Sequence, residues 1–563
     1  HHFLFPSNLL LFEPQTLDMW LANKIFGGEE GQDTNETKTD ASSTAEEATT
    51  PKWVATMSKD NSIASATGKF FEIDLNGKLN ERASNVTVCL LSAGDFEYVL
   101  TVFAADKLVH DQPVSPTMQM AFKEADHSMR WMSYKGSIRT LSVQFSDKGE
   151  WDTFRMQFAR ANFEVGTQQH FDKTVKEGDR GWQAGAYDDD SDYDSKEDDE
   201  DEDQLDYDDY DTHAKSRNSV LGIEEAFNRN LNVGMSTDRT FVTRGERVGI
   251  FSQGGDDMKY IGQFSLTDLD GEVVVPHHTM LHNQDHNLMM LDPEQNDRVF
   301  VGDIERNQIV TELNIGGEDY DFKARNLGHA TKYGSRTGDA TIVANGKNCF
   351  YTIDTRVNSR KEAAMKTRVD RGGVEFSCIA STGDGQVALG SKQGTIAMYS
   401  AADSKRAKSL LPGLGDPITA IDVTERGDWI LATTDHYLLL VPTTIPDDPN
   451  QTTGFCKSLP ANNKPKPIKL QLKHCDLLKY GISHVKLNQA RFDTGDHAEK
   501  WIVTSTGSFL ITWSLRKVKQ GKLDYKIKET SSRVVANEFR YNRNDVVILD
   551  PDDLYVEKRS SRK

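Results

Sequence analysis

The chain has 563 residues and a net charge of −21 at pH 7, and a chain of this length is expected to fold as two or three domains. No apolar run approaches the roughly 18–20 residues that span a bilayer, so no membrane-spanning helix is expected. The five cysteines, Cys89, Cys349, Cys378, Cys456 and Cys475, are scattered and mostly lie in apolar stretches. We therefore expect buried, reduced thiols and a cytoplasmic protein, with a nuclear pool as an alternative.

The first 50 residues are expected to be disordered. Residues 1–26 open with an apolar run but lack a basic n-region and a small-residue cleavage site, so they do not fit a secretory signal peptide. We expect the natural start at Met19. Residues 27–50 contain few large apolar side chains, and such a segment cannot offset the entropy of folding.

Short strands alternate with turns from residue 51 to residue 165. The candidate strands are 52–57, 69–74, 86–92, 97–102, 118–122, 129–134 and 138–145. The period then changes over 148–164, where Trp151, Phe154, Phe158 and Ala161 fall on one helical face. About seven strands followed by one amphipathic helix is the layout of a pleckstrin-homology-like domain, a β-barrel capped by one helix.

Many domains of this kind bind phosphoinositide lipids through Lys and Arg side chains gathered in the first hairpin. Here that hairpin offers only Lys52, Lys59 and Lys69, at wide spacing. A protein-docking or structural role is therefore preferred, and lipid binding is an alternative that the sequence does not favour.

Residues 166–218 are expected to form an acidic disordered linker. Its densest part, 187–211, holds 16 Asp and Glu residues against Lys196 alone, a net charge of −15. Mutual repulsion keeps such a tract extended. The tract would also repel nucleic-acid phosphates, and no basic stripe elsewhere compensates, so no nucleic-acid partner is expected.

Two interpretations of the acidic tract stay open: a solvated linker, or a docking strip for a basic partner. Ser191 and Ser195 are each followed three residues later by Asp, the context that acidophilic kinases prefer. They are candidate phosphosites, and phosphate there would deepen the negative charge.

From about residue 219 a unit of apolar strands and Gly/Asp turns recurs. Its clearest copies are 376–399 and 418–441. The middle strand of each unit is predicted at 240–245, 287–292, 340–345, 386–391, 429–434, 501–506 and 546–551. A period of about 45 residues is typical of a β-propeller blade. We therefore predict a mostly β protein with a C-terminal WD-type β-propeller of about seven blades over 219–563, six or eight remaining open, in which 442–470 is a long inter-strand loop.

Pro412 and Gly413 lead into Leu414, Gly415, Asp416 and Pro417, which together form a candidate interaction loop. Such a loop either presents a rigid surface to a partner or simply fixes the connection between blades, since Pro and Gly set its backbone angles. The neighbouring basic residues at 405, 406 and 408 could receive an acidic segment, including the chain's own acidic tract.

No catalytic motif is evident. The phosphate-binding G-x-x-x-x-G-K-[ST], the G-x-S-x-G of hydrolases and C-x-x-C are missing from the sequence. His277, His278, His282 and His286 could bind zinc only if they lay on one helical face, but the following NLMML is typical of a strand. We therefore expect no enzyme activity, no catalytic residue, no cofactor, no metal and no small-molecule substrate.

Several segments carry a more specific signal than the repeat. The most specific are PGLGDPI at 412–418 and GDWILATTDHYLLL at 427–440; others lie at 230–251, 280–291, 297–310, 500–528 and 533–553. In these segments the chain resembles the vacuolar import and degradation protein 27 family, whose plant members are the defective-embryo-and-meristems proteins. The resemblance implies a pleckstrin-homology-like domain, an acidic stretch and a C-terminal propeller in this order. It also implies a cytoplasmic, non-enzymatic protein linked to vacuolar delivery in fungi, and to growth and contact with a small nuclear GTPase in plants.

Two classes of function follow. In the first, the chain is a non-enzymatic interaction scaffold that binds proteins through its propeller and pleckstrin-like surfaces. In the second, it is a membrane-trafficking adaptor whose pleckstrin-like domain binds phosphoinositide lipid. The fold does not choose between them, because propellers host many activities.

Overall fold

The computed structural model describes residues 62–189, 226–253, 258–315, 323–357, 373–460 and 464–558, with the backbone of four further short strands. All of these belong to one compact unit, Thr56–Lys563. The expected disordered segment 1–50, the expected strand 52–57 and the candidate phosphosites Ser191 and Ser195 lie outside the described residues.

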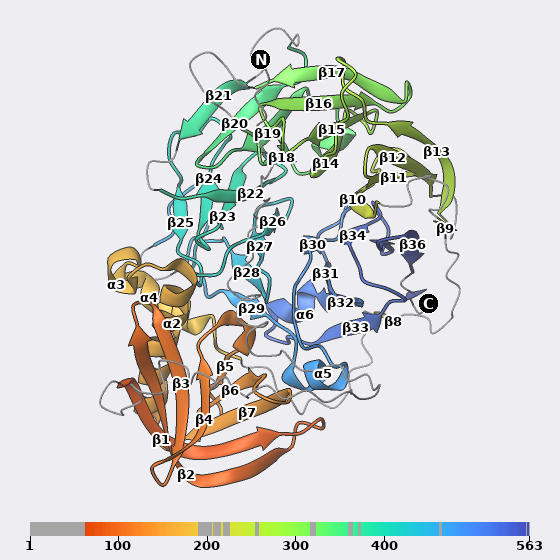
Figure 1. Ribbon diagram of the computed structural model, residues 1–563. Helices are drawn as coiled ribbons and strands as arrows, with labels where there is room; N and C mark the ends of the chain where they lie inside the picture. Colours follow the sequence, from red (N-terminus) through yellow and green to blue (C-terminus); the bar gives the residue numbers. More distant parts are fainter. Residues whose placement is uncertain are drawn as a thin grey trace, which may run out of the picture. The chain divides into compact units, whose positions relative to one another are not determined.

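Residues 62–145 form one antiparallel sheet in the order β4-β3-β2-β1-β7-β6-β5 (Figure 1). Its strands are β1 (Ser62–Ile73), β2 (Leu79–Gly94), β3 (Glu97–Ala104), β4 (Lys107–Pro113), β5 (Ala121–Lys123), β6 (Ser128–Ser133) and β7 (Arg139–Phe145), with a 3-10 turn η3 (Pro116–Met118) before β5. The strand β4 was not predicted from the sequence, and only the second half of β1 was. The sheet and the helix that follows it confirm the pleckstrin-homology-like layout.

The helix α2 (Lys148–Thr167) covers this sheet with the face that the sequence predicted. Trp151, Phe154, Phe158 and Ala161 are all buried in one apolar cluster with sheet residues. Asp147 caps the helix by accepting a hydrogen bond from the Glu150 backbone N–H. The helix therefore begins where its cap and its apolar spacing predict.

The segment after α2 corrects one expectation. Residues 166–218 were expected to be a disordered linker, yet the chain continues into α3 (Phe171–Thr174) and α4 (Glu177–Gly185). The reason is apolar burial, since Phe171 and Trp182 are 3% and 7% exposed. The dense acidic residues begin only at Asp188, after these two helices.

The described residues of the C-terminal part form seven four-stranded sheets, which confirms the predicted propeller (Figure 1). Blade 1 contains β10 (Asn228–Val233), β11 (Arg239–Arg244), β12 (Arg247–Ser252) and β13 (Lys259–Ser265). Blade 2 contains β14 (His278–His282), β15 (Asn287–Leu291), β16 (Arg298–Asp303) and β17 (Gln308–Asn314). Blade 3 contains β18 (Asn326–His329), β19 (Thr341–Asn345), β20 (Cys349–Asp354) and β21 (Ala364–Val369), with the 3-10 turn η5 (Gly334–Arg336) after β18. All seven predicted middle strands are present as the second strands of the blades.

Blades 4 to 7 are built in the same way. Blade 4 contains β22 (Phe376–Ser381), β23 (Val387–Ser391), β24 (Ile396–Tyr399) and β25 (Ser409–Leu411), and blade 5 contains β26 (Ala420–Val423), β27 (Trp429–Thr433), β28 (Leu438–Pro442) and β29 (Ile468–Leu470). Blade 6 contains β30 (Arg491–Phe492), β31 (Trp501–Thr506), β32 (Phe509–Ser514) and β33 (Tyr525–Glu529). Blade 7 contains β34 (Ala536–Phe539), β35 (Val546–Leu549), β36 (Asp553–Glu557) and β9 (Ser216–Arg217). Two short helices, α5 (His474–Lys479) and α6 (Leu515–Lys519), lie in the connections around blade 6.

Blade 7 closes the ring with a strand from the other end of the domain. Its outermost strand is β9, which precedes blade 1 in the sequence and pairs antiparallel with β36. A second short pair joins β8 (Leu205–Asp206) to β37 (Ser560–Ser561). The first and last parts of the propeller are thus held together by backbone hydrogen bonds.

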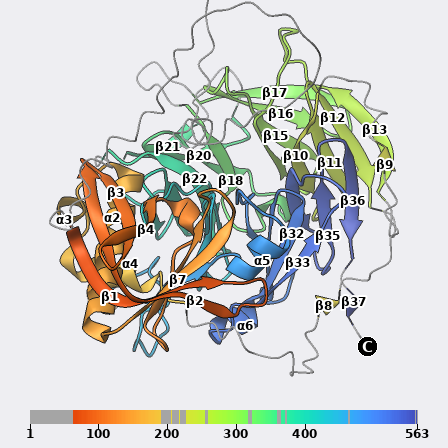
Figure 2. The same ribbon diagram turned by 60° about the horizontal axis from the view of Figure 1, so that its bottom comes forward.

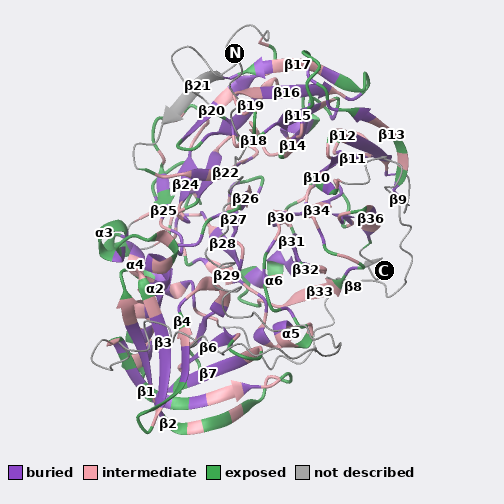
Figure 3. Ribbon diagram, viewed as in Figure 1, coloured by how far each residue is buried: buried purple, intermediate pink, exposed green. Residues whose placement is uncertain are grey.

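Polar side chains join the blades near the axis of the ring. At every boundary between neighbouring blades, a hydrogen bond connects the innermost strands or the residues leading into them. Going around from blade 1, the donor and acceptor pairs are Asn230–Pro276, His278–Leu327, Asn326–Ser377, Ser377–Ile418, Phe492–Asp422, Asn488–Val534 and Val233–Glu538. The apolar cores of the blades lie outside this polar ring and are almost fully buried (Figure 3).

We predict that Asn488→Ala destabilises the propeller. The Asn488 side chain donates to Val534 O at 2.8 Å and to Ser505 Oγ at 2.9 Å, and both acceptors would lose this donor. The expected loss is about 1–3 kcal/mol. Thermal unfolding monitored by intrinsic fluorescence should show a midpoint lowered by several degrees. The exposed Asn450→Ala is the matched control and should leave the midpoint unchanged; equal midpoints for both variants would contradict the prediction.

Candidate functional site

The candidate loop 412–417 lies at the junction between the pleckstrin-like domain and the propeller. Leu414 is 2% exposed, Gly415 and Asp416 are also buried, and only Pro417 is exposed. Gln183 in α4 donates from Nε2 to the Gly413 carbonyl at 2.5 Å. Of the two interpretations of this loop, the buried positions favour a structural connection over a surface presented to an outside partner, because the chain's own helices cover it.

Glycine residues allow this close approach. Gly415 has φ +106°, and a Cβ there would lie 2.8 Å from the Phe163 Cα in α2. A Cβ on Gly166, at the end of α2, would lie 2.8 Å from the Gly415 carbonyl oxygen. Backbone therefore packs directly on backbone at this point, which explains why residues 166 and 415 are both glycine.

A buried polar cluster continues the junction. The Tyr437 hydroxyl donates to Asp416 Oδ2 at 2.6 Å, and Asn162 Nδ2 in α2 donates to the Tyr187 hydroxyl at 2.8 Å. Lys469 Nζ in β29 lies 4.7 Å and 4.9 Å from the ring centroids of Tyr187 and Tyr437, close enough for cation–π attraction. One lysine thus links an aromatic ring of each domain.

Burial controls the titration of these groups. Burial lowers the pKa of Lys469 to about 8, although the nearby Asp416 acts in the opposite direction. Burial also raises the pKa of the Asp416 carboxyl, against the hydrogen bond from Tyr437. Both groups have partners inside the fold, so a structural role accounts for them.

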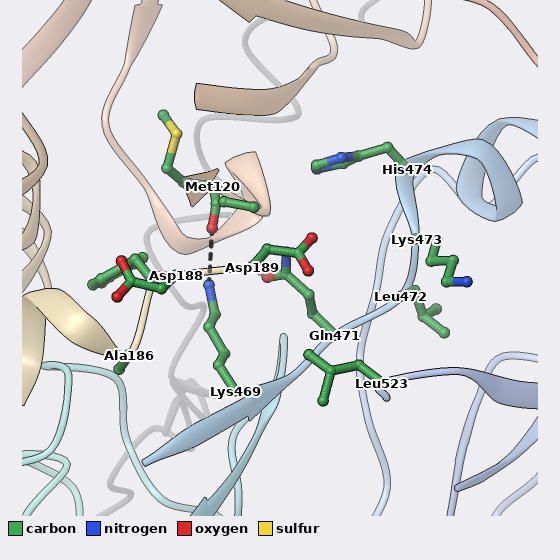
Figure 4. A pocket seen from close by; sticks show the side chains of 12 residues that line it. Met120, Ala186, Asp188, Asp189, Lys469, Gln471, Leu472, Lys473, His474 and Leu523 are labelled. Atoms are coloured by element: carbon green, nitrogen blue, oxygen red, sulfur yellow. Dashed lines mark hydrogen bonds between the residues drawn. The ribbon is translucent and has the colours of Figure 1, made fainter. Parts of the chain in front are cut away.

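Figure 4 shows the small pocket beside this cluster, with Lys469 pointing at the Met120 carbonyl, to which it donates at 3.2 Å. The pocket is lined by residues 120–121 and 186–189 of the first domain and by residues 469 and 471–474 and Leu523 of the propeller. His474 Nε2 donates to the Gln119 carbonyl at 2.8 Å, and Gln119 Nε2 donates to the His436 carbonyl at 3.1 Å. These bonds tie the pocket walls together.

Ion pairs complete the junction. Lys464 pairs with Asp179 in α4, and both side chains are only 9% exposed. Lys466 lies 3.3 Å from Asp188, which also pairs with Arg155 of α2. The described beginning of the acidic tract therefore contacts the lysines of 464–469. The exposed basic residues at 405, 406 and 408, a second place where an acidic segment could bind, lie in the β24–β25 connection.

A second unusual feature is residues 330–337, between β18 and β19, here called the bridging segment. Its backbone and side chains contact residues in the innermost strands of the other blades or just after them. The contacts are Lys332 with Thr382 and Asp422, Tyr333 with Gly495 and Tyr541, Ser335 with Gln284 and Met235, and Arg336 with Asp496. Blade 3 therefore reaches all six other blades, and this segment crosses one end of the ring's axis.

The four histidines lie in and beside the strand β14, not on a helix, and NLMML forms the strand β15 as predicted. His277 and His278 donate from Nε2 to the carbonyls of Arg325 and Leu327 in the next blade, at 3.0 Å and 3.1 Å. Asp285 accepts from the backbone N–H groups of Ser236 and Thr237 in the preceding blade. In the part of the chain that the structure describes, no three His, Cys, Asp or Glu side chains converge as a metal site would require.

The first described hairpin of the pleckstrin-like domain carries balanced charge. Lys69, Lys78 and Arg82 alternate with Glu72, Asp74 and Glu81, and Arg82 lies 2.7 Å from Glu72. The two lysines at 52 and 59 that the sequence analysis considered lie outside the described residues. No helix of the described residues is both long and apolar enough to cross a bilayer.

Sequence reasoning missed the importance of Lys469 and of the bridging segment. The run KPKPIKLQLK at 464–473 carried a signal, because four lysines opposite an acidic stretch favour a contact between them. The bridging segment carried none, since its contacts are with residues of six other blades that are far apart in the sequence.

We predict that Gly166→Val separates α2 from the 412–417 loop. The valine Cβ would meet the Gly415 carbonyl, and backbone cannot move aside cheaply. Hydrogen exchange should rise several-fold in 412–417 and in α4, while the strands of the other blades keep their protection. Gly181→Val in α4 is the control, because a Cβ there meets no atom within 4 Å. Equal exchange in both variants would show that the contact is dispensable.

We predict that stability depends on the titration of Lys469. Its pKa is about 8 in the folded chain and is usually near 10.5, so the unfolded chain holds more protons at this position between these values. Stability therefore rises with pH across this window. The unfolding midpoint of the native chain, measured against that of Lys469→Met, should increase from pH 8 to pH 10. Lys466→Met removes an exposed lysine of the same segment but keeps Lys469. The difference in midpoint between the native chain and this variant should therefore stay constant from pH 8 to pH 10.

Comparison with known proteins agrees with this architecture. The family model described as the VID27 C-terminal WD40-like domain matches residues 226–563, and the model of the VID27 PH-like domain matches residues 65–165. The β-propeller domain of Myceliophteria thermophila Cps50 (Swd1) covers 61% of this chain and 99% of its own, at 12% identity and a TM-score of 0.44. That likeness is too weak to carry any argument about binding.

Two curated relatives share one name. Vacuolar import and degradation protein 27 of Saccharomyces cerevisiae is 32% identical over 350 residues, which are 60% of this chain and 44% of the relative. Its Schizosaccharomyces pombe namesake is 28% identical over 516 residues, 85% of this chain and 64% of the relative. The chain thus matches less than two thirds of either relative's length. Because the propeller model matches more than half of the chain, the chain belongs to the vacuolar import and degradation protein 27 family.

Proposed function

We propose that the chain is a non-enzymatic interaction scaffold that serves vacuolar import and degradation in the cytoplasm. The observation that supports this most is the buried junction, in which Lys469, Leu414 and α2 join two domains of binding type into one unit. A partner held on one domain is then presented at a fixed place relative to a partner on the other. Such a unit gains affinity by multivalent binding.

The polar groups of the described residues also fit a scaffold better than an enzyme. Burial lowers the pKa of His278 and of His474 to about 4, so both are neutral near pH 7, and each donates to a backbone carbonyl. A general acid or base instead needs a pKa near the working pH and a free path to substrate. These histidines hold the fold together.

Affinity purification of the tagged full chain, followed by cross-linking and mass spectrometry, tests this proposal. We expect vacuolar-import or vesicle proteins whose cross-links map to both the pleckstrin-like domain and the propeller. The Gly166→Val variant should recover several-fold less of any partner that touches both domains, whereas Gly181→Val should recover as much as the native chain. Recovery of nuclear-transport proteins instead would favour a role in growth and cell division, and no specific partner at all would contradict a scaffold.

The alternative function is an adaptor whose pleckstrin-like domain binds phosphoinositide. The balanced charge of the first described hairpin does not favour this alternative. An anionic headgroup beside Lys69, Lys78 and Arg82 would also lie near three carboxylates. We therefore predict that the full chain floats equally with liposomes that contain or lack phosphoinositide.

A charge-reversed variant makes the flotation assay decisive. Glu72→Lys with Glu81→Lys leaves Asp74 in its turn, where it accepts from the Asn76 and Lys78 backbone N–H groups. This variant should gain phosphoinositide-dependent flotation, which shows that the assay responds to charge on the hairpin. Phosphoinositide-dependent flotation of the native chain would favour the lipid-binding adaptor instead.

A further inference from the structure

The outer part of blade 6 is strongly basic. Between Leu515 and Lys528 the chain holds six basic residues against Asp524 alone, a net charge of +5. They belong to α6, to the turn after it and to β33, and we call them the blade-6 basic edge: Arg516, Lys517, Lys519, Lys522, Lys526 and Lys528. The charge is concentrated in 14 residues of a chain that is acidic overall.

The strand geometry places two of these lysines on one face. In β33, Tyr525 and Ile527 pack against the apolar cluster between blades 5 and 6. Lys526 and Lys528 alternate with them and therefore point to the other face of the strand. Lys528 pairs there with Glu557 of β36, so this face is turned toward blade 7.

The acidic tract begins beside this edge. Asp189 lines the same pocket as Lys473 and Leu523, and Leu523 lies in the turn that leads into β33. Lys473 pairs with Asp524 of that turn. The last residue of the pleckstrin-like part that the structure describes is thus already at the start of the blade-6 basic edge.

The tract also ends close to this edge. Asp206 in β8 is paired with Ser560, three residues after Glu557, the partner of Lys528. Ten residues further on, Ser216 in β9 pairs with Leu554 of blade 7. Both views show β8 near the end of β33 (Figure 1, Figure 2). The chain must therefore pass from one end of β33 to the other.

The segment between these two points has the matching charge. Residues 190–204 hold ten Asp and Glu residues and Lys196, a net charge of −9. Fifteen residues reach at most about 50 Å when fully extended, so the whole segment stays within that distance of both of its ends. Opposite charges that are confined to the same stretch of surface meet at a high effective concentration.

We propose that the blade-6 basic edge is a docking surface and that residues 190–204 of the same chain occupy it. The contact is a set of exposed ion pairs, each weak by itself, whose sum depends on ionic strength. Ser191 and Ser195 lie in the docked segment, so their phosphorylation would add negative charge opposite the lysines and tighten the contact. The basic residues at 405, 406 and 408 are not the receiving surface.

The test measures binding in trans to the full chain. In one form of the chain, the ten acidic residues of 190–204 are changed to Asn or Gln, which keeps the length of the connection. A fluorescent peptide with the sequence of 190–204 is titrated into this form and into the native chain at low ionic strength. We expect at least ten-fold tighter binding to the neutralised form, because its docking surface is vacant, and loss of that binding in 0.5 M salt, about the range where such pairs are screened.

Charge reversal locates the surface. In the neutralised form, Lys522→Glu with Lys526→Glu should weaken peptide binding at least ten-fold. Lys405→Glu with Arg406→Glu removes the same charge from the other basic site and should change it less than two-fold. Carbodiimide cross-linking of the native chain should join carboxylates of 190–204 to Lys522 or Lys526. Equal peptide affinity for the native and neutralised forms, or unchanged binding after reversal at 522 and 526, would overturn the proposal.

Discussion

Closure of the propeller depends on the pairing of β9 with β36. This contact brings a strand that precedes blade 1 in the sequence to the outer edge of blade 7. The chain therefore contributes a strand to the last blade before it forms the first one. The segments that precede β9 must therefore lead to the outer edge of blade 7. The pleckstrin-like domain is held at blades 4 and 5 by Leu414, Lys464 and Lys469. Thirty residues then separate the end of its last helix, α4, from β9.

The junction shows how two domains share one interior. Met132 of β6 packs in the apolar cluster of blades 5 and 6, and Leu414 packs in the cluster that also contains Trp151 and Phe158. Polar groups buried there are satisfied across the boundary, as for the carbonyls of Gln119 and Gly413. The buried apolar side chains and the buried hydrogen bonds at this boundary both disfavour independent motion of the two domains. We expect the relative orientation of their binding surfaces to be part of the function.

Local sequence signals predicted the repeated elements and failed at contacts between distant residues. Each middle strand has its own apolar run and turn residues, so the period of about 45 residues was visible, and the spacing of Trp151, Phe154 and Phe158 predicted α2. The loop at 412–417 was recognised as constrained, but its cover comes from Phe163, Gly166 and Gln183, more than 200 residues away. A single sequence does not show which residues meet across that distance. The helices α3 and α4 were missed because four and nine residues are too few for a periodic pattern beside an acidic stretch.

The bridging segment changes how the propeller should unfold. In most repeat proteins each unit contacts only its neighbours, so stability is a sum of local terms and the ends can fray independently. Here Lys332, Tyr333 and Arg336 connect blade 3 to blades on the opposite side of the ring. Loss of any one blade removes contacts from this segment and thereby weakens all the others. The domain is therefore built to melt in a single cooperative transition, and partially unrolled forms of the ring should be too sparse to expose their strand edges to aggregation.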